Sequence, residues 1–266
     1  MIDRHQFIAD CEAVREQSPL VHNITNYVAM NIAANVLLAA GASPLMSFCP
    51  EEMDEIVSIC GALVINIGCL DRHEIEGMKA AAAAAHRLGK PWVLDPVGAG
   101  ASDIRTRTAL ELIREYHPTV IRGNASEIMC VAGQTIQSRG VDTSASSADA
   151  VEAAKALAKA TGAVVSVSGA TDYITDGERV ETITNGHPAM GKITAMGCSA
   201  SALTGAFVAV SSDPFRGALN CMAAMGVAGD MAASKGYRGT GTFQVDFLDA
   251  LSTMDAAEAA EMIRQK

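Results

Sequence analysis

Short apolar runs alternate along this chain with longer segments in which apolar residues recur at helical spacing. The short runs predict buried strands at 19–22, 43–47, 62–67, 92–95, 119–122 and 163–167. The longer segments predict helices at 3–16, 27–40, 51–60, 71–88, 103–116, 148–160, 198–211, 214–235 and 243–264, and another that begins after Asn124. Strands that are apolar throughout and alternate with helices indicate an α/β fold, with a mostly parallel sheet covered on both faces.

Four features modify this simple alternation. The pair Asp176-Gly177 lies between two short alternating runs and predicts a hairpin over 173–183, which adds antiparallel strands to the sheet. The predicted helix 27–40 is too rich in apolar residues for a surface helix. Residues 134–147 are polar and predict an exposed loop, while Ser252-Thr253 predicts a break in the final helix. Because the same rhythm resumes after that loop, we expect one domain spanning 1–266.

Composition narrows the class of protein. The 20 basic and 30 acidic residues give a net charge of −10, which argues against a general binder of nucleic acid or of anionic membranes. No apolar run reaches membrane-spanning length, and the N-terminus lacks the basic-then-apolar pattern of a signal peptide. The seven cysteines are odd in number and include no CxxC pair, as is typical of free thiols in a reducing compartment. We therefore expect a soluble cytoplasmic protein.

A polar segment that leads into a small-residue helix carries the first candidate chemistry. Thr194 to Gly197 is expected to form a loop at the N-terminus of the helix that starts at Cys198. Free backbone N–H groups and the positive end of the helix dipole make such a place an anion site, and Gly197 allows a phosphate to come close. The same environment would lower the pKa of the Cys198 thiol. The alternative interpretation is a core helix in which Cys198 is an inert filler.

Other polar residues follow the predicted strands, where ligands of an open parallel sheet gather. Asp95 ends an apolar strand, which suits a carboxylate that serves this crevice, although it could also form the turn before Pro96. Asn124 and Glu127 stand three residues apart at a helix start. They could hold a hydrated Mg²⁺ through an amide and a carboxylate, or they could simply cap the helix.

Four segments together resemble hydroxyethylthiazole kinases of the ribokinase-like superfamily: PLVHNITN at 19–26, LDPVGAG at 94–100, RGNASE at 122–127 and AMGC at 195–198. The resemblance covers nearly the whole chain in the expected order. It implies a three-layer ribokinase-like sandwich and a transfer, dependent on ATP and Mg²⁺, of the γ-phosphoryl group to the hydroxyl of 4-methyl-5-(2-hydroxyethyl)thiazole, in thiamine salvage. It also implies a homotrimer with its thiazole pockets at subunit interfaces.

The resemblance also assigns roles to individual residues. Thiazole-contacting positions correspond to Met46, Asn26 and Ala195, and many relatives carry glycine at position 195. Nucleotide-binding positions correspond to Arg122 and Ser168, with the Asn124 amide beside them at the cofactor. Acidic positions associated with Mg²⁺ and phosphate chemistry correspond to Asp95 and Glu127.

The resemblance assigns catalytic roles to Gly197, Cys198 and Asp95. Backbone N–H groups at 195–198 would stabilise the transferring phosphoryl group, and Cys198 stands where sugar kinases of the superfamily carry a catalytic aspartate. Cys198 would accept the proton of the substrate hydroxyl, or would matter mainly through its size and placement.

Other interpretations remain open on the sequence. The chain could be a related kinase for hydroxymethylpyrimidine or pyridoxal, or a nucleotide-dependent hydrate dehydratase that shares the anion site. It could also be a silent nucleotide- or thiazole-binding protein, although a pure binder has no need of Asp95, Glu127 and Cys198 together. His22 is expected to be a hydrogen-bonded histidine at a strand end, and His187 a turn residue.

Overall fold

An eight-stranded sheet forms the centre of the computed structural model, which describes residues 2–135 and 147–266. The strand order is β2-β1-β3-β4-β5-β6-β7-β8. Strands β1 to β6 are parallel, and β7 and β8 add an antiparallel hairpin. The bounds are β1 (Leu20–Ile24), β2 (Ser43–Met46), β3 (Ala62–Asn66), β4 (Trp92–Asp95), β5 (Val120–Asn124), β6 (Val164–Ser168), β7 (Asp172–Thr175) and β8 (Val180–Ile183).

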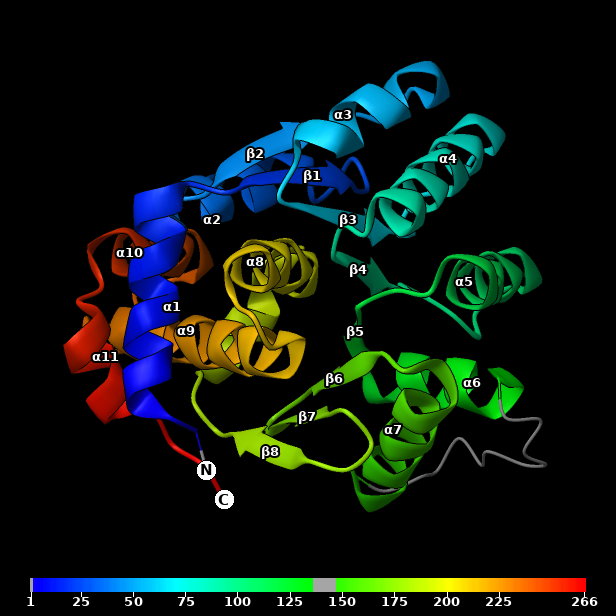
Figure 1. Ribbon diagram of the computed structural model, residues 1–266. Helices are drawn as coiled ribbons and strands as arrows, with labels where there is room; N and C mark the ends of the chain where they lie inside the picture. Colours follow the sequence, from blue (N-terminus) through cyan, green and yellow to red (C-terminus); the bar gives the residue numbers. More distant parts are fainter. Residues whose placement is uncertain (1, 136–146) are drawn as a thin grey trace.

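Helices cover both faces of this sheet (Figure 1). One layer holds α3 (Met53–Ile59), α4 (Arg72–Leu88), α5 (Asp103–Tyr116), α6 (Ala125–Thr135) and α7 (Ser147–Thr161). The other holds α1 (Arg4–Gln17), α2 (Met30–Ala40), α8 (Met196–Val210), α9 (Pro214–Ser234), α10 (Thr240–Thr253) and α11 (Ala256–Met262). Two short 3-10 helices, η1 (Pro50–Glu52) and η2 (Pro188–Lys192), lie in connections. The chain therefore has the three-layer α/β architecture expected from its sequence.

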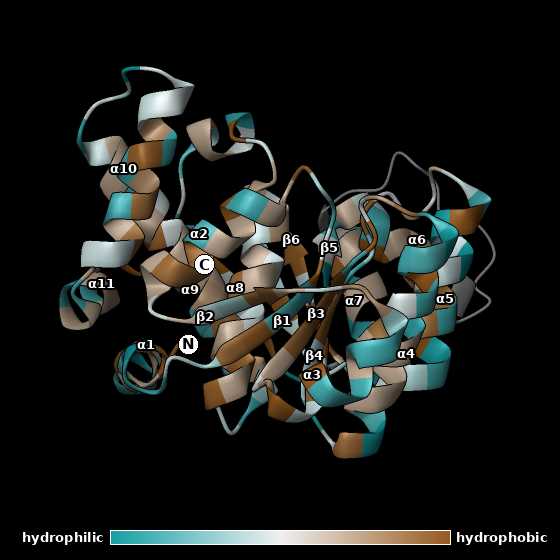
Figure 2. Cartoon of the chain, turned by 90° about the horizontal axis from the view of Figure 1, so that it is seen from above, coloured by the Kyte–Doolittle hydropathy of each residue, from teal (hydrophilic) through white to brown (hydrophobic). Residues whose placement is uncertain are grey.

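Alternation along each strand divides the apolar residues between two cores. Val64 and Val93 are paired neighbours that face the α8 side, whereas Ile65 and Leu94, one position further on, face the α4 side. Because both faces are covered, the strands at the centre of the sheet are mainly hydrophobic, as Figure 2 shows in brown.

Helix α8 lies directly on the sheet because it carries a glycine where it crosses the strands. A Cβ atom at Gly205 would come within 2.6 Å of a Val64 methyl group and 2.8 Å of a Val21 methyl group. Real Cβ contacts are longer, so any other residue would force the helix away from β1 and β3. This close approach fixes the height of α8 above the strand ends.

Several sequence predictions are confirmed in detail. The hairpin forms with Gly177 at φ +98, and the last helix breaks between α10 and α11. Residues 136–146, most of the predicted loop, lie outside the described residues. Across the described residues, no helix combines the length and apolar character needed to cross a membrane.

The observed helix α2 differs from the helix predicted at 27–40. It begins only at Met30, because residues 26–29 form a turn. The expectation that its apolar density would keep it off the surface is wrong for the chain taken by itself, since Leu38 is 59% exposed. The preceding turn also exposes Val28.

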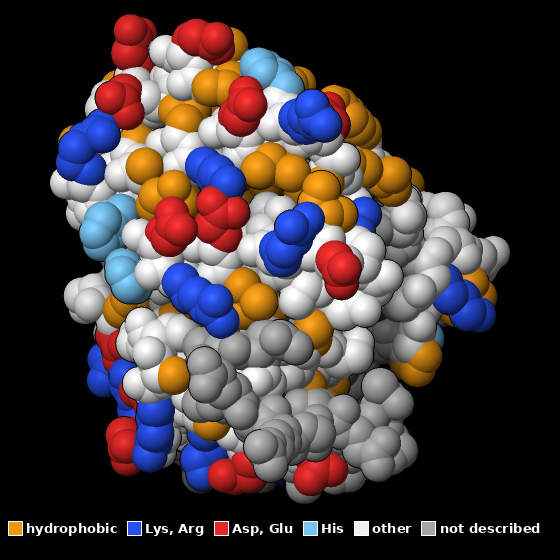
Figure 3. Space-filling model, turned by 90° about the vertical axis from the view of Figure 1, so that its right-hand side faces the viewer, with side chains coloured by type: hydrophobic (Ala, Val, Ile, Leu, Met, Phe, Trp, Pro, Cys, Tyr) orange, Lys and Arg blue, Asp and Glu red, His pale blue; other side chains and the backbone are white. Residues whose placement is uncertain are grey.

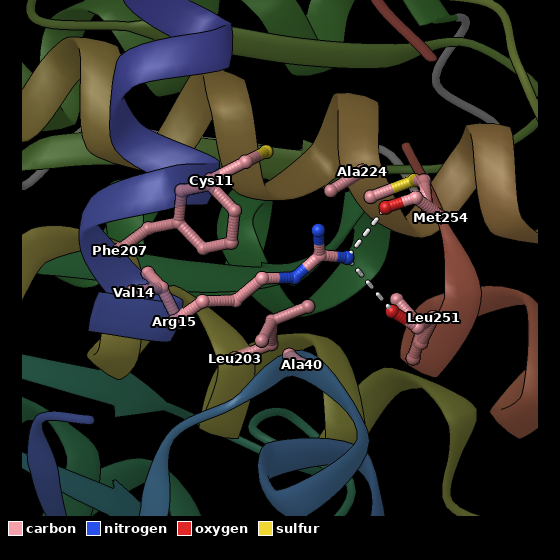
Figure 4. Close-up of a pocket in the computed structure, with 9 residues that line it drawn as sticks. All are labelled: Cys11, Val14, Arg15, Ala40, Leu203, Phe207, Ala224, Leu251 and Met254. Atoms are coloured by element: carbon pink, nitrogen blue, oxygen red, sulfur yellow. Dashed lines mark hydrogen bonds between the residues drawn. The ribbon is translucent and has the colours of Figure 1, made fainter. Parts of the chain in front are cut away.

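A small cavity lies between α1 and the layer formed by α8, α9 and α10 (Figure 4). The Arg15 guanidinium reaches across it, and its Nη2 donates to the carbonyl oxygens of Met254 (2.6 Å) and Leu251 (3.5 Å) at the end of α10. The cavity has a volume of about 10 Å³, which is enough for roughly one water molecule. This cavity is therefore a packing feature and not a ligand site.

The outer face on the α4–α6 side carries lysine and arginine side chains interspersed with aspartate and glutamate (Figure 3). No large area of a single charge gathers on the described part of this face.

Candidate active site

Polar residues from five strands meet the start of α8 at the carboxyl edge of the sheet. Asn66, Asp95 and Ser168 are the last residues of β3, β4 and β6. Arg122 lies in β5, and Asn26 follows β1 by two residues. Parallel strands bring these ends to one edge, as the sequence predicts.

Asp95 is the centre of a buried hydrogen-bond network. Its Oδ2 accepts from Asn66 Nδ2 and from Ser201 Oγ, both at 2.7 Å, and Arg122 Nη1 lies 3.9 Å away. Burial raises the pKa of the Asp95 carboxyl to about 6, while the Arg122 charge and the hydrogen bonds from Ser201 and Asn66 oppose this increase. Asp95 is therefore largely ionised at neutral pH.

The network continues from Asp95 to Cys198 through two amides. Asn66 gives its N–H to Asp95, so its Oδ1 faces Asn26 and accepts from Asn26 Nδ2 at 2.9 Å. Asn26 Nδ2 also donates to Cys198 Sγ at 3.4 Å, and Asn26 Oδ1 accepts from the Ala29 N–H at 3.0 Å. An ionised carboxylate accepts only, and it therefore fixes the orientation of both amides.

The protonation state of Cys198 differs from the expectation. Burial raises the pKa of the Cys198 thiol, and the nearby Asp95 charge raises it further, against smaller opposing effects of Asn26, Asn66 and Arg122. The prediction that the helix N-terminus lowers this pKa is wrong, because the thiol is enclosed beside a carboxylate. Cys198 is a thiol at neutral pH.

Helix α8 also begins two residues earlier than predicted. The helix begins at Met196, so Gly197, which the sequence predicts at the end of the loop, lies with Cys198 in the first turn. The first helical bond runs from the Ser199 N–H to the Ala195 carbonyl at 2.8 Å, and the preceding amides have no intrahelical acceptor. Ala195 caps the helix in the left-handed region (φ 59, ψ 20), a conformation that favours glycine.

Arg122 lies directly against Gly197. A Cβ atom at position 197 would come within 2.9 Å of Arg122 Nη1, so the guanidinium occupies the space that a side chain would need. Arg122 is only 6% exposed, and its Nε has no hydrogen-bond acceptor among the described residues. A buried cation with an unused N–H beside a helix start favours an anionic ligand.

A cavity of about 550 Å³ opens beside these two residues. The sequence-predicted residues Arg122, Ser168 and Gly197 line it, and Ser168 Oγ donates to the Gly123 carbonyl at 3.3 Å. The remaining lining comes from the β6–β7 connection, β7, the segment that follows β8, α8 and α9: Gly169, Ala170, Asp172, Asn185, Gly186, His187, Pro188, Met190, Gly191, Met196, Ala200, Met222, Met225 and Gly226. Its size suits a nucleotide.

Asn124 and Glu127 form a reciprocal helix cap. Asn124 Oδ1 accepts from the Glu127 N–H, and Glu127 Oε2 accepts from the Asn124 N–H, both at 2.9 Å. Glu127 Oε1 also accepts from the Gly98 N–H at 2.9 Å, which ties the loop after β4 to the first turn of α6. Glu127 lies close enough to Asp95 for its charge to raise the Asp95 pKa. The capping interpretation accounts for these bonds.

Met46 and His22 lie outside the cavity lining, whereas His187 is part of it. Met46 ends β2 and is half-buried against the α8-side core, beside Asn23 of β1. His22 Nε2 bonds the Ser47 carbonyl at 2.9 Å, and burial lowers the His22 pKa, as expected for a strand-end histidine. His187 caps the N-terminus of η2, where its Nδ1 accepts from the Ala189 N–H. Both histidines therefore have the structural roles expected of them.

Comparison with known proteins agrees with this geometry. The model of the Hydroxyethylthiazole kinase family matches residues 11–257. The chain belongs to the hydroxyethylthiazole kinase family. Two relatives with the name hydroxyethylthiazole kinase are similar over most of their length. The Leptospira biflexa protein is 53% identical over 259 residues, 97% of this chain and 95% of the relative. The Nitratidesulfovibrio vulgaris (strain DP4) protein is 51% identical over 243 residues, 91% of each chain.

Solved structures support the family and the fold. The structure of a hydroxyethylthiazole kinase protein from Pyrococcus horikoshii has a TM-score of 0.89 and 38% identity, and the match covers 98% of both chains. A pyridoxal kinase from Staphylococcus aureus has a TM-score of 0.58 at 16% identity, covering 80% of this chain and 88% of that one. The second similarity concerns the ribokinase-like fold alone.

Three site residues of this family member escape sequence reasoning. Arg105 donates to the carbonyls of Ile67, Val97 and Gly68 at 2.8–2.9 Å and so joins two loops of the site. In the sequence it looks like an ordinary basic residue on a surface helix. Ser201 could have been found, because it lies one turn after Gly197 on the same helix face. Asp172 gives no local signal, since the hairpin alone brings it to the cavity.

Proposed function

We propose that this chain phosphorylates the hydroxyl group of 4-methyl-5-(2-hydroxyethyl)thiazole with ATP, as a step of thiamine salvage. The observation that carries the proposal is the contact between Arg122 and Gly197 at the start of a helix whose next residue, Cys198, is hydrogen-bonded to Asn26. An anion site and a site for a neutral alcohol would then adjoin at one helix turn. Such a pairing suits phosphoryl transfer, in which positioning and charge stabilisation supply most of the rate.

The phosphates would lie where Arg122 faces the first turn of α8. The amides of Met196, Gly197 and Cys198 precede the helical ladder, and they would donate to the transferring phosphoryl group. The Arg122 guanidinium would neutralise charge from the opposite side. Ser168 ends β6 on the wall of the same cavity and would contact the nucleotide.

The thiazole alcohol would lie on the β1–β2 side of Cys198. Asn26 contacts the thiol directly, and Met46 and Ala195 are partly buried against the same core. Cys198 has a raised pKa, so it would place the substrate hydroxyl and not act as a thiolate base. The proton would leave late in a loose transition state, and a base would contribute little.

Asp95 and Glu127, with the Asn124 amide beside them, would hold Mg²⁺ through water. The two carboxylates lie close enough for their charges to interact, and Mg²⁺ prefers oxygen ligands while keeping several waters. Residues 2–135 and 147–266 contain no group of three or more histidine, cysteine, aspartate or glutamate side chains that could hold a metal ion. Bound Mg²⁺ supplies charge neutralisation at the phosphate oxygens.

We further propose that the chain is one domain, works in the cytoplasm and assembles as a homotrimer with thiazole pockets at the interfaces. The single sheet supports one domain, and the seven free cysteines support a reducing compartment. Two observations support assembly: Tyr27 and Val28 directly follow Asn26 and are 59% and 62% exposed, and Leu38 of α2 is 59% exposed.

A coupled ADP-release assay tests the proposed function. We expect turnover with the thiazole alcohol, ATP and Mg²⁺, little turnover with hydroxymethylpyrimidine or pyridoxal, and loss of activity with EDTA that Mg²⁺ restores. Turnover with pyridoxal alone would reassign the acceptor. Nucleotide binding without turnover of any alcohol would favour a silent binding protein.

A further inference from the structure

The cavity beside Arg122 has an unusual lining for a nucleotide site. Four of the thirteen methionines of the chain line it: Met190, Met196, Met222 and Met225. They come from η2, α8 and α9, so three separate elements each bring a thioether to the same space. Methionine is flexible and polarizable, and protein surfaces that accept several partners often use it.

Met190 is packed against two positions without side chains. Met190 Sδ lies so close to Gly229 that a Cβ there would collide with it, and it lies 3.3 Å from the Cβ position of Gly186. Met222 and Met225 are 5% and 2% exposed on α9, one turn apart. The wall that they form is therefore apolar and can adjust its shape by small rotations.

Most polar side-chain atoms on this side of the cavity already have hydrogen-bond partners. Asn185 donates to Asp230 (2.7 Å) and to the Met262 carbonyl (2.8 Å), and its Oδ1 accepts from the Arg264 N–H (2.6 Å). His187 accepts from the Ala189 N–H through Nδ1, and the residue is exposed, so only its Nε2 remains available. Little side-chain capacity therefore remains for reading the edge of a base.

The carboxylate of the cavity lining, Asp172, lies on the side of Arg122, where the phosphates would bind. Asp172 Oδ1 accepts from the Gly169 N–H at 2.9 Å, and its charge interacts with that of Arg122. An ionised carboxylate beside the phosphate-binding arginine can accept from ribose hydroxyls, which all ribonucleotides share. Asp172 would therefore not distinguish adenine from guanine.

We propose that this cavity selects a nucleoside triphosphate by its phosphates and sugar and holds the base by methionine packing, without selecting the base. The inference rests on the proposed function, because it takes the cavity as the nucleotide site. A site that reads a substrate by buried hydrogen bonds rejects the wrong one by about 10⁴-fold or more, whereas apolar packing discriminates by about 10- to 200-fold. Adenine and guanine differ mainly in their hydrogen-bonding edges, so packing alone discriminates weakly between them.

The experiment compares ATP and GTP in two ways. Calorimetric titration of the full chain with each nucleotide and Mg²⁺ measures binding without the thiazole alcohol, and the coupled assay measures kcat/KM with it. We expect ATP and GTP to differ by less than about thirtyfold in both measurements. A larger preference for ATP overturns the inference, as does a failure of either nucleotide to bind. Equal binding without turnover would remove the proposed function and leave this inference standing.

A pair of variants tests the role of the methionines. Met190→Leu keeps the volume and loses the flexible thioether, and we expect it to weaken ATP and GTP binding by the same factor, about threefold to tenfold. Met129→Leu makes the same change on α6, outside the cavity, and should leave both affinities unchanged. Weakening of ATP binding alone by Met190→Leu would show that the site reads adenine, which contradicts the inference.

Discussion

At the scale of single residues, Cys198 is the clearest case in which its surroundings decide the chemistry. Its thiol lies at a helix start, but burial and the Asp95 charge raise its pKa. We therefore expect Cys198→Ala to retain at least about a tenth of wild-type kcat, because a thiol that is not ionised at neutral pH is not the base. Rates between pH 7 and 9 measure this.

The pH profile supplies the control for Cys198. A rate that depended on its thiolate would rise about tenfold per pH unit below the thiol pKa, and the alanine variant would lose that rise. We expect the two profiles to be parallel. A rise confined to the wild type would restore the base role.

Gly197 offers a second prediction at this scale. In Gly197→Ala the new Cβ would displace the Arg122 guanidinium, so we expect KM for ATP to increase at least about tenfold, the effect of losing a charge-assisted hydrogen bond. Gly191→Ala is the matched control, since Gly191 lines the same cavity with no atom within 4 Å of its Cβ position. Equal effects of the two substitutions would remove Arg122 from nucleotide binding.

At the scale of elements, the start of α8 carries measurable strain. Ala195 has φ 59, which costs an alanine about 1–2 kcal/mol, while a glycine in the unfolded chain costs about 0.5–1 kcal/mol of entropy. The difference predicts that Ala195→Gly raises the free energy of unfolding by about 0.5–1 kcal/mol in urea titration. Ala202→Gly, in the middle of the same helix, should lower it by about 1 kcal/mol. A loss of stability at both positions would contradict the strain argument.

The hairpin β7–β8 carries a predicted pH dependence. Burial raises the pKa of Asp172 from 3.8 to about 6, against the Gly169 N–H and the Arg122 charge. The folded protein binds this proton more tightly than the unfolded chain, so the free energy of unfolding falls as pH rises from about 4 through 6. Asp172→Asn removes this loss, and we expect it to stabilise the protein by roughly 1–3 kcal/mol at pH 7 and little at pH 4.

A neighbouring aspartate is the control for Asp172. Burial acts to raise the Asp176 pKa, but hydrogen bonds from Arg179 and two backbone N–H groups outweigh it and lower the pKa. Asp176→Asn should therefore destabilise the protein at pH 7. Urea titrations at pH 4 and 7 compare the two variants, and a gain for Asp172→Asn at both pH values would argue against burial as the cause.

Local pattern predicted most elements, because strands buried on both faces and amphipathic helices leave different periodicities in the sequence. It could not predict that Cys198 keeps its proton, because this depends on burial of the thiol and on the charge of Asp95 in β4. It also could not predict Arg105, whose role arises only when the loops after β3 and β4 lie beside α5. The sequence motifs therefore located the site at the carboxyl edge of the sheet, whereas the pKa values of its side chains follow from tertiary packing.

At the scale of the whole molecule, assembly is the main prediction. Val28 is 62% exposed two residues from Asn26, so a charge there would have to be buried in the proposed interface. We expect the wild type to sediment at three times the chain mass, and Val28→Glu to sediment as a lighter species with lower activity. Ile104→Glu, on α5 in the opposite layer and 46% exposed, should change neither. A fully active monomeric wild type would disprove the trimer.

The close packing of α8 on the sheet has a consequence for substitutions far from either substrate. Gly205 lies two turns beyond Cys198, about 10 Å along the helix. The proposed reacting groups are divided between this helix and the strand ends, so the gap between layers sets their separation. One added methyl group at 205 would widen that gap and spoil the alignment while every reacting side chain stayed intact. A survey of inactive variants would therefore include substitutions at the contact between α8 and the sheet, because the reaction requires this distance between the two layers.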